Sequence, residues 1–398
     1  MFLINYYDIL ILKSVIMDGI WYYAIAFIVI WLIAFIFKNS IERFGIEVNF
    51  PVIMWKTKRL RGFINKIANL APRFWKMYMN VGIAVSVICM AFMLVSLIYS
   101  LNMIMDSPAV SLIIPGVEVP GSPIFIPFFY GFVALATVLI VHEFSHGILA
   151  RVENINIKSI GLLLFIILPG AFVEPDESEM NECSRPSKLR VYAAGSIANF
   201  SLAAIAMVLM IVCSSIIVPA VFNEDGIEIN RVVSDSPADG YLKEGMIIQS
   251  INDYEINNSD SYVNAVSTLK PNSIINIGTN QGNFSLKGSV NPNNQSLGYI
   301  GIQSQSHYSL NEYFDNQIYS PLLWVLIQLP QLFMWIYFLN FAVGSFNLLP
   351  MKPLDGGYIF ENLMSYIVSD TTLKYISTFL TALVAIIIIF SLIYGFFA

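Results

Sequence analysis

Residues 129–150 read FYGFVALATVLIVHEFSHGILA, an apolar stretch whose only acidic, basic or histidine side chains are His142, Glu143 and His146. A helix needs roughly 20 apolar residues to cross the hydrocarbon core of a bilayer, so this stretch is long enough to span it. Residues four apart share one face of a helix, which lets both imidazoles bind one metal ion with Glu143 beside them. The stretch therefore predicts a membrane-spanning helix that carries an H-E-x-x-H metal site.

The composition of the whole chain also indicates a membrane protein. Of its 398 residues, 57% are hydrophobic and 12% are charged, whereas soluble globular chains carry about 25% charged residues. Together with a mean hydropathy of +0.68, these figures exclude a disordered chain and a soluble enzyme with one ordinary core.

Charge and cysteine content exclude two further classes of protein. A net charge of −6 provides no basic surface field, so no nucleic-acid partner is expected. The three cysteines, Cys89, Cys183 and Cys213, lie far apart and form no CxxC pair. They therefore predict neither a disulfide framework nor a thiolate zinc site.

Six apolar runs meet or nearly meet the length needed to cross a bilayer. They cover residues 20–37, 81–103, 129–150, 191–221, 322–346 and 376–397. We therefore predict an α-helical multi-pass membrane protein with about six spanning helices.

Two other apolar stretches are poor candidates for spanning helices. Residues 107–128 contain five prolines and a turn-rich run, which favours an irregular or re-entrant segment. Residues 160–173 are too short to cross and contain Pro169-Gly170. Each stretch is open to a functional role or to simple packing at the membrane surface.

The basic residues predict the orientation in a cell membrane. Residues 38–76 hold nine of the chain's 21 Lys and Arg against two acidic residues, and loops of this kind stay in the cytoplasm. Alternation of the spans then places residues 222–319, with 11 acidic and four basic side chains, on the outer side. The H-E-x-x-H site would face the cytoplasmic side.

The polar stretch 223–305 is predicted to be a separate α+β unit. Ser236-Pro237-Ala238 is followed by GMIIQSIN at 245–252, by a helix-compatible segment and by short strands. This order resembles the PDZ domains attached to proteases, although Met246 replaces the usual Asp and Asp253 the usual Gly. A PDZ-like domain implies a groove that accepts an extended peptide as an added strand.

A metal site built on two histidines needs a further ligand, because catalytic zinc usually has three protein ligands. His307 follows the outer unit and is a poor choice on topology. Asp355, in Leu354-Asp355-Gly356-Gly357, falls at the cytoplasmic end of the fifth span and is the favoured third ligand. The alternative is that Asp355 serves as the N-cap of a helix that runs from Gly356 to Ser369.

These motifs resemble the site-2 protease family of intramembrane zinc metalloproteases. The matching segments are HEFSHG at 142–147, PGAFVEPD at 169–176, AGSIAN at 194–199 and NLLPMKPLDG at 347–356. Ser196 stands where the family pattern has Pro. The resemblance covers residues 129–357 and includes the position of the PDZ-like insert between two catalytic halves.

The resemblance implies a zinc ion held by His142, His146 and Asp355, with Glu143 as the general base. A tetrahedral oxyanion also needs a hydrogen-bond donor, and Asn347 is the candidate. A structural hydrogen bond between helices is nearly as good an account of Asn347 and a better one of Asn199.

Four regions follow from the spans and the motifs. Residues 1–128 would form an N-terminal membrane region, 129–221 the half with H-E-x-x-H, 222–306 the PDZ-like domain, and 307–398 the half with Leu354-Asp355-Gly356.

The resemblance also implies the class of substrate, a single-pass membrane protein cut within its spanning segment (regulated intramembrane proteolysis). A helix hides its peptide bonds, so the segment must unwind, and residues 161–173 could pair with the exposed strand. The PDZ-like domain would admit only substrates already trimmed of a bulky outer domain.

Two other functions compete with proteolysis. An ion- or proton-coupled transporter would need further charged residues along several spans and an internal repeat, and neither is found in the sequence. A catalytically inactive membrane adaptor that binds partners through its PDZ-like domain would be favoured by a broken set of ligands, whereas here the set is intact.

Overall fold

The computed structural model describes residues 6–102, 110–117, 119, 122, 124–291, 294–315 and 320–397. The chain divides into two compact units. We call Met1–Met210 together with Gln331–Ala398 the membrane unit, and Ile211–Pro330 the inserted unit. The boundaries of the four regions expected from the sequence stay a prediction.

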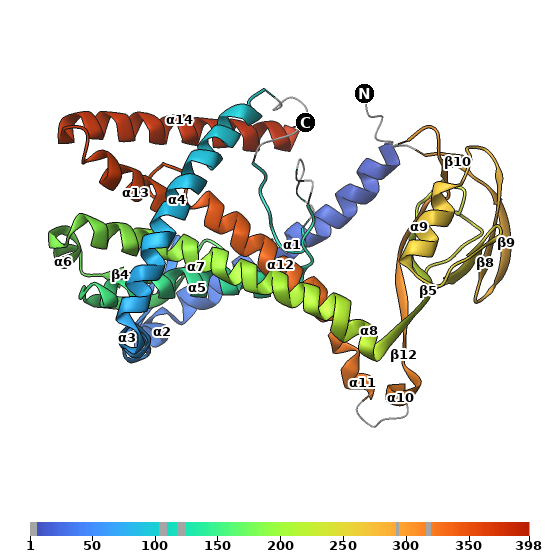
Figure 1. Ribbon diagram of the computed structural model, residues 1–398, viewed down its shortest axis with the longest axis horizontal. Helices are drawn as coiled ribbons and strands as arrows, with labels where there is room; N and C mark the ends of the chain where they lie inside the picture. Colours follow the sequence, from blue (N-terminus) through green and yellow to red (C-terminus); the bar gives the residue numbers. More distant parts are fainter. Residues whose placement is uncertain are drawn as a thin grey trace. The chain divides into compact units, whose positions relative to one another are not determined.

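Long helices make up most of the membrane unit (Figure 1). Its helices are α1 (Tyr6–Ile36), α2 (Lys38–Glu42), α3 (Arg61–Leu70), α4 (Pro72–Ser100), α5 (Phe128–Val152), α6 (Glu177–Glu182), α7 (Arg185–Val212), α12 (Val325–Phe346), α13 (Asp355–Met364) and α14 (Asp370–Phe397). Local chemistry explains where two of these helices begin. Pro72 occupies the first turn of α4, where its missing N–H costs nothing. The Asp176 side chain caps α6 by accepting hydrogen bonds from the N–H groups of Ser178 and Glu179.

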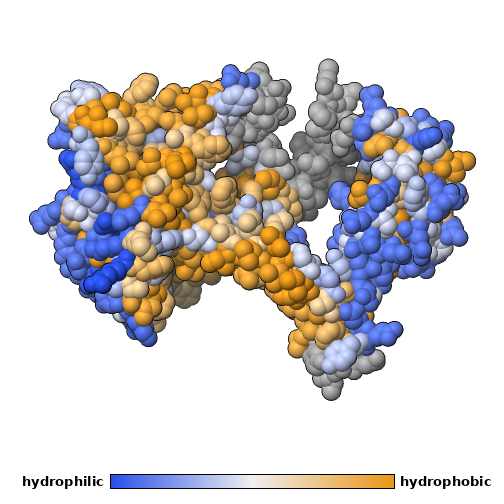
Figure 2. Space-filling model, viewed as in Figure 1, coloured by the Kyte–Doolittle hydropathy of each residue, from blue (hydrophilic) through white to orange (hydrophobic). Residues whose placement is uncertain are grey.

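Five of the helical segments are long and apolar enough to cross a membrane. They are Pro72–Ser100, Phe128–Val152, Arg185–Val221, Val325–Phe346 and Asp370–Gly395, and they coincide with five of the six expected spans. The remaining expected span, 20–37, falls in α1, whose described apolar part is the shorter Trp21–Ile36. Hydrophobic residues cover the surface of the long helices (Figure 2), as expected for a multi-pass membrane protein.

A four-stranded antiparallel sheet also belongs to the membrane unit. Its strands β1 (Ile46–Asn49), β2 (Val52–Thr57), β3 (Ile157–Phe165) and β4 (Leu168–Pro175) lie in the order β1-β2-β3-β4. The short apolar stretch 160–173 is therefore a hairpin. It is extended by two strands from the basic segment 38–76, and β4 forms one edge of the sheet.

The stretch 107–128, expected to be irregular, lies partly outside the described residues. Within residues 110–117 and 124–127 the backbone forms no helix. Ile114 and Val117 form an isolated bridge, and the Gly116 N–H donates to the Ile126 oxygen at 2.7 Å. Ile126 is fully buried against Ala134, Val138 and Trp335. The described part of this stretch therefore packs on the helices.

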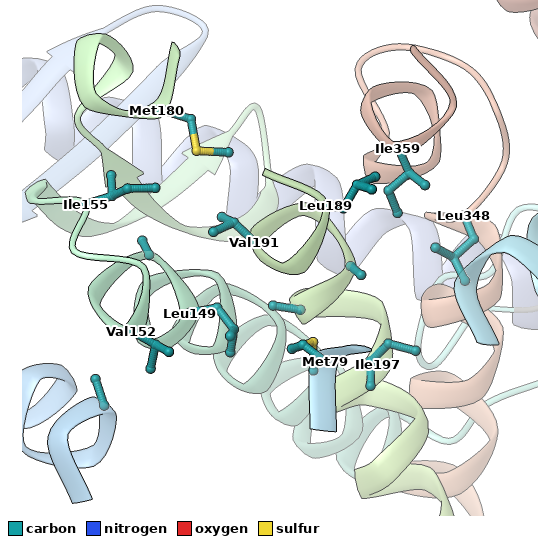
Figure 3. Packing of buried hydrophobic residues seen from close by; sticks show 14 of the residues in the cluster. Met79, Leu149, Val152, Ile155, Met180, Leu189, Val191, Ile197, Leu348 and Ile359 are labelled. Carbon is teal, nitrogen blue, oxygen red and sulfur yellow. The ribbon is translucent and has the colours of Figure 1, made fainter. Parts of the chain in front are cut away.

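A buried apolar cluster joins α4, α5, α7 and α13 (Figure 3). Met79 from α4 and Ile197 from α7 are buried in it, together with Leu149 from α5 and Ile359 from α13. Because α5, α7 and α13 carry the candidate site residues described below, the cluster holds the relative positions of these residues.

A buried carboxylate just beyond the end of α5 links this helix to α4 and α7. The Glu153 side chain is only 4% exposed and lies 2.9 Å from Arg190 Nη1 and 3.3 Å from Lys76 Nζ. Ser187 Oγ donates a hydrogen bond to it at 2.7 Å. Burial alone would raise the pKa of Glu153, but the hydrogen bonds from Ser187 and Arg190 and the nearby positive charges lower it below its ordinary value.

Replacing Glu153 with Gln is expected to lower the free energy of unfolding by about 1–3 kcal/mol, because Arg190 loses a buried partner. Glu42→Gln breaks only an exposed ion pair with Lys38 and should cost under about 1 kcal/mol. The folded-state pKa of Glu153 lies below the ordinary 4.5. Its contribution is therefore complete above that pH and is lost as the pH falls through the lowered pKa. Thermal unfolding in detergent at neutral and acidic pH measures both effects, and equal losses for the two variants would contradict this account.

The inserted unit contains a six-stranded sheet, a short two-stranded sheet and helix α9 (Ser259–Ser267). Its strands are β5 (Phe222–Val232), β6 (Ile247–Ile251), β7 (Tyr254–Glu255), β8 (Ile274–Thr279), β9 (Gly282–Lys287), β10 (Ser289–Val290), β11 (Gly298–Tyr299) and β12 (Ile302–Leu310). The larger sheet has the order β12-β5-β6-β8-β9, with β7 paired to β6. Short segments η1 (Cys213–Ile217), α8 (Val218–Val221), α10 (Glu312–Asp315) and α11 (Ser320–Leu323) flank the sheets along the chain.

The inserted unit has its own hydrophobic core. Ile229, Ile248, Ile251 and Ile275 are fully buried in it, and Ala265 of α9 packs against them. Hydrophilic residues predominate on its surface in Figure 2. A separate α+β unit was expected for residues 223–305.

Candidate metal centre

Three side chains far apart in the sequence meet in the membrane unit. His142 and His146 lie one turn apart on α5, with their ring centroids separated by 4.8 Å. Asp355 is the first residue of α13. Its Oδ2 atom lies 3.3 Å from His142 Nε2 and 3.4 Å from His146 Nε2. The structure thus brings together the three residues that the sequence predicted as ligands.

The donor set fits a tetrahedral zinc ion. The candidate ligand atoms lie within 4.8 Å of one another, and ligands about 2.0–2.1 Å from a tetrahedral ion are separated by about 3.3 Å. The two measured carboxylate–imidazole distances agree with that separation. Asp355 Oδ2 is also buried and, although both imidazole nitrogens lie near it, it has no hydrogen-bond partner among the described residues. A buried carboxylate oxygen without such a partner is available to bind a metal.

The glycines after Asp355 allow the turn that delivers its carboxylate. The Gly356 N–H donates to the backbone oxygen of Asn347 at 2.8 Å. A Cβ on Gly356 would lie 2.3 Å from the oxygen of Leu348, so no larger residue fits there. Helix α13 begins at Asp355 and ends at Met364, and its N-cap residue is Leu354. The alternative in which Asp355 caps a helix to Ser369 is therefore wrong.

Asp355 is a carboxylate under ordinary conditions. Burial alone would raise the pKa of Asp355, but the neighbouring imidazoles of His146 and His142 together outweigh burial and hold this pKa well below the usual range. The ionised form is the one that binds a metal.

Both imidazoles are oriented through their second nitrogen. His146 Nδ1 lies 2.7 Å from the backbone oxygen of Val191, and His142 Nδ1 lies 3.2 Å from the side-chain amide of Asn199. Hydrogen bonds of this kind fix the ring and leave Nε2 for the metal. The Asn199 atom that faces Nδ1 is the amide nitrogen, whereas the amide oxygen is buried without a hydrogen-bond partner among the described residues. A metal on Nε2 puts the proton of His142 on Nδ1, and exchanging the amide's oxygen and nitrogen then lets the oxygen accept that hydrogen bond. Asn199, expected to make only a structural bond between helices, therefore contacts the site itself.

Helix α7 comes close to both rings at Gly195. A Cβ at this position would lie 2.5 Å from His146 Nε2 and 2.6 Å from His142 Nε2. Because glycine carries only a hydrogen in place of a side chain, the two nitrogens stay free to bind one ion. The sequence contained this signal in Ala194-Gly195-Ser196, but the contact with the histidines could be seen only in three dimensions.

Gly195→Ala is expected to weaken zinc binding by about 100-fold or more, because the added methyl group displaces the imidazoles. Gly62→Ala is the matched control, since nothing lies within 4 Å of a Cβ there and alanine favours a helix. Zinc titration of the two purified variants measures the difference. Wild-type affinity in Gly195→Ala would show that the histidine nitrogens do not hold the ion.

Glu143 contacts the sheet beside the histidines. Its Oε2 accepts a hydrogen bond of 3.1 Å from the backbone N–H of Val173 in β4. Glu143 and the three candidate ligands line a cavity of about 630 Å³, and Asn347 lines it as well. The cavity thus contains every residue that the sequence predicted for the site.

His307 lies elsewhere. It belongs to β12 of the inserted unit, where its Nδ1 is 2.5 Å from Asp225 Oδ1. Among the described residues, the group of His, Cys, Asp and Glu that could hold a metal consists of His142, His146 and Asp355.

A helix with H-E-x-x-H and a distant aspartate, set among apolar helices, defines a membrane metalloprotease. The model of peptidase family M50 matches residues 130–391, and the chain belongs to this family, the site-2 proteases. Relatives include an uncharacterised protein of Methanocaldococcus jannaschii, 28% identical over 84% of this chain and 83% of its own. A membrane-bound transcription factor site-2 protease homologue of Arabidopsis thaliana is 26% identical over 40% of this chain and 31% of its own.

Among solved structures, the PDZ domain of an SdrC-like protein from Listeria innocua is similar to part of this chain. It is 23% identical, with a TM-score of 0.19, and the match covers 21% of this chain and 97% of that one.

Proposed function

We propose that this protein is an intramembrane zinc endopeptidase that cleaves the spanning segments of membrane-anchored proteins. The observation that carries the proposal is the convergence of His142, His146 and Asp355 beside Glu143, in a cavity among apolar helices. An adaptor has no need of a complete donor set. A transporter would need further charged residues along several spans, and the sequence shows none.

The residues around the cavity have separate roles in the proposed hydrolysis of the peptide bond. A zinc ion held by the three ligands would polarise the scissile carbonyl and acidify water. Glu143, one residue after His142, takes a proton from the attacking water at its carboxylate and later gives it to the leaving amine. The N–H of Val173 holds that carboxylate in place.

Asn347 is proposed as the donor that stabilises the oxyanion. Asn347 lines the cavity, and its backbone oxygen accepts the hydrogen bond from Gly356, next to Asp355. The position of Asn347 is thus tied to that of a ligand. An amide donor aimed at developing negative charge is worth about 100-fold or more in rate.

The substrate is proposed to bind as an added strand on β4. β4 forms one edge of its sheet, and edge strands present unpaired backbone groups. An unwound segment paired with β4 gains backbone hydrogen bonds that replace those of its helix. Because Val173 of β4 contacts Glu143, a segment bound there passes close to the general base.

The inserted unit is proposed to act as a filter on the outer side of the cell membrane, with the metal site toward the cytoplasm. Its surface is largely hydrophilic (Figure 2), and its segment carries an excess of acidic residues. A PDZ-like unit there would exclude single-pass substrates that still carry a bulky outer domain.

The proposal is tested by reconstituting the full chain in liposomes with a panel of single-pass proteins, each with and without its outer domain. The trimmed substrates are expected to be cleaved. This cleavage should stop when a zinc chelator is added and return when zinc is restored. Cleavage that continues in the chelator would contradict the metal mechanism. Equal cleavage of full-length and trimmed substrates would contradict the filter alone.

A further inference from the structure

A second hollow of the membrane unit lies between α5 and the four-stranded sheet. It has a volume of about 450 Å³, and we call it the sheet groove. Its helical wall carries five side chains from the first half of α5: Phe132, Leu135, Ala136, Leu139 and Ile140. Its floor is formed by strand residues that include Ile46, Ile53, Trp55, Leu162, Leu164 and Ala171. No charged residue lines it among those described.

The floor of the sheet groove is one face of the sheet. Ile46 pairs with Trp55, Trp55 with Leu162, and Leu162 with Ala171. Residues paired across neighbouring strands point to the same face. A continuous apolar surface therefore runs from β1 to the edge strand β4.

The same face of β4 continues into the catalytic cavity. Residues two apart on a strand share a face. On β4, Pro169 and Ala171 line the sheet groove, while Val173 and Pro175 line the cavity. Leu139 of α5 lines both. The groove is thus an extension of the cavity along a single strand.

We infer that the sheet groove is a specificity subsite, which receives large apolar side chains of the substrate on one side of the scissile bond. The inference rests on the proposed function. Continuity with the cavity favours a substrate segment over a lipid chain as the occupant, because a strand added to β4 directs alternate side chains onto this face.

The strand geometry specifies which positions of the substrate are selected. A strand rises about 3.3 Å per residue, so Ala171 and Pro169 lie about 7 and 13 Å from Val173. Side chains two and four residues from the one opposite Val173 therefore enter the groove. Leu, Ile, Met or Phe should be preferred there, and charged residues rejected by the cost of desolvation.

Ala136→Phe fills the groove from its helical wall and tests the inference. The full chain is reconstituted with paired substrates that carry Leu or Ala at positions two and four, placed on either side of the scissile bond. Wild type should prefer Leu by about tenfold in kcat/KM on one side only. Ala136→Phe should remove that preference chiefly by slowing the Leu substrate.

Two further variants make the test specific. Val95→Phe introduces the same side chain at an exposed position of α4 and should keep the preference for Leu. Leu162→Ala enlarges the groove and should extend the preference to Trp. Leu162→Ala also tests the inference if Ala136→Phe does not fold.

The outcomes separate the inference from the proposed function. Unchanged preference in both groove variants, or no preference in the wild type, would overturn the subsite and is the result expected of a groove that holds lipid. A wild type that cleaves none of the substrates would instead overturn the proposed function.

Discussion

Replacing Glu143 with Gln is expected to lower the rate of substrate cleavage by about 10³-fold, within the range of general acid–base catalysis. The amide keeps the shape of the side chain but cannot take a proton from the attacking water. Zinc content and thermal stability should stay at wild-type values, because the three candidate ligands are untouched. Single-turnover cleavage of a membrane-anchored substrate measures the loss.

The control for Glu143 is Glu182→Gln, which removes an exposed carboxylate from the end of α6. Its cleavage rate should match that of the wild type. If Glu143→Gln cleaved as fast as Glu182→Gln, another group would have to be the base.

His142→Ala is expected to abolish both zinc binding and proteolysis. Loss of one of three ligands should weaken zinc binding by about 10³-fold or more, so the purified protein should contain far less than one zinc per chain. Metal analysis of the purified variant checks this outcome.

His307→Ala is the matched histidine control, because His307 pairs with Asp225 in the inserted unit. It should keep one zinc per chain. Equal zinc content in the two histidine variants would show that the ion is held elsewhere.

Much of the site could be predicted from local patterns. His142 and His146 share a helical face by spacing alone, and helix α5 confirms that placement. Asp355 was predicted from its place near the end of a span, and it lies beside both imidazoles. Helix periodicity and span length depend on residues that are close together in the chain, so both can be read from the sequence.

Contacts between distant segments could not be predicted in this way. β1 and β2 come from a basic segment expected only to be a loop, and they form a sheet because β3 pairs with β2 more than 100 residues later. Residues 161–173, expected to offer a strand to the substrate, do lie in the hairpin of strands β3 and β4, and pairing with a substrate stays a prediction. The contact of β4 with Glu143 through Val173 depends on that sheet. Strand formation depends on neighbours in space more than on intrinsic preference.

The contacts of Asn199 and Gly195 with the histidines could not be predicted from the sequence either. A buried Asn on an apolar helix usually bonds to a neighbouring helix, and here that bond is made to His142, a candidate ligand. The requirement for Gly195 comes from the imidazoles of another helix. The first expected span remains a prediction, since the described apolar part of α1 is short.

The position of the cleaved bond is the most direct test of the account. Mass spectrometry of the products from a single-pass substrate, cut by the full chain in liposomes, would locate it. The account predicts a zinc-dependent cut within the apolar spanning segment, absent with Glu143→Gln. A cut confined to the polar residues outside that segment, or one made equally by Glu143→Gln, would contradict it.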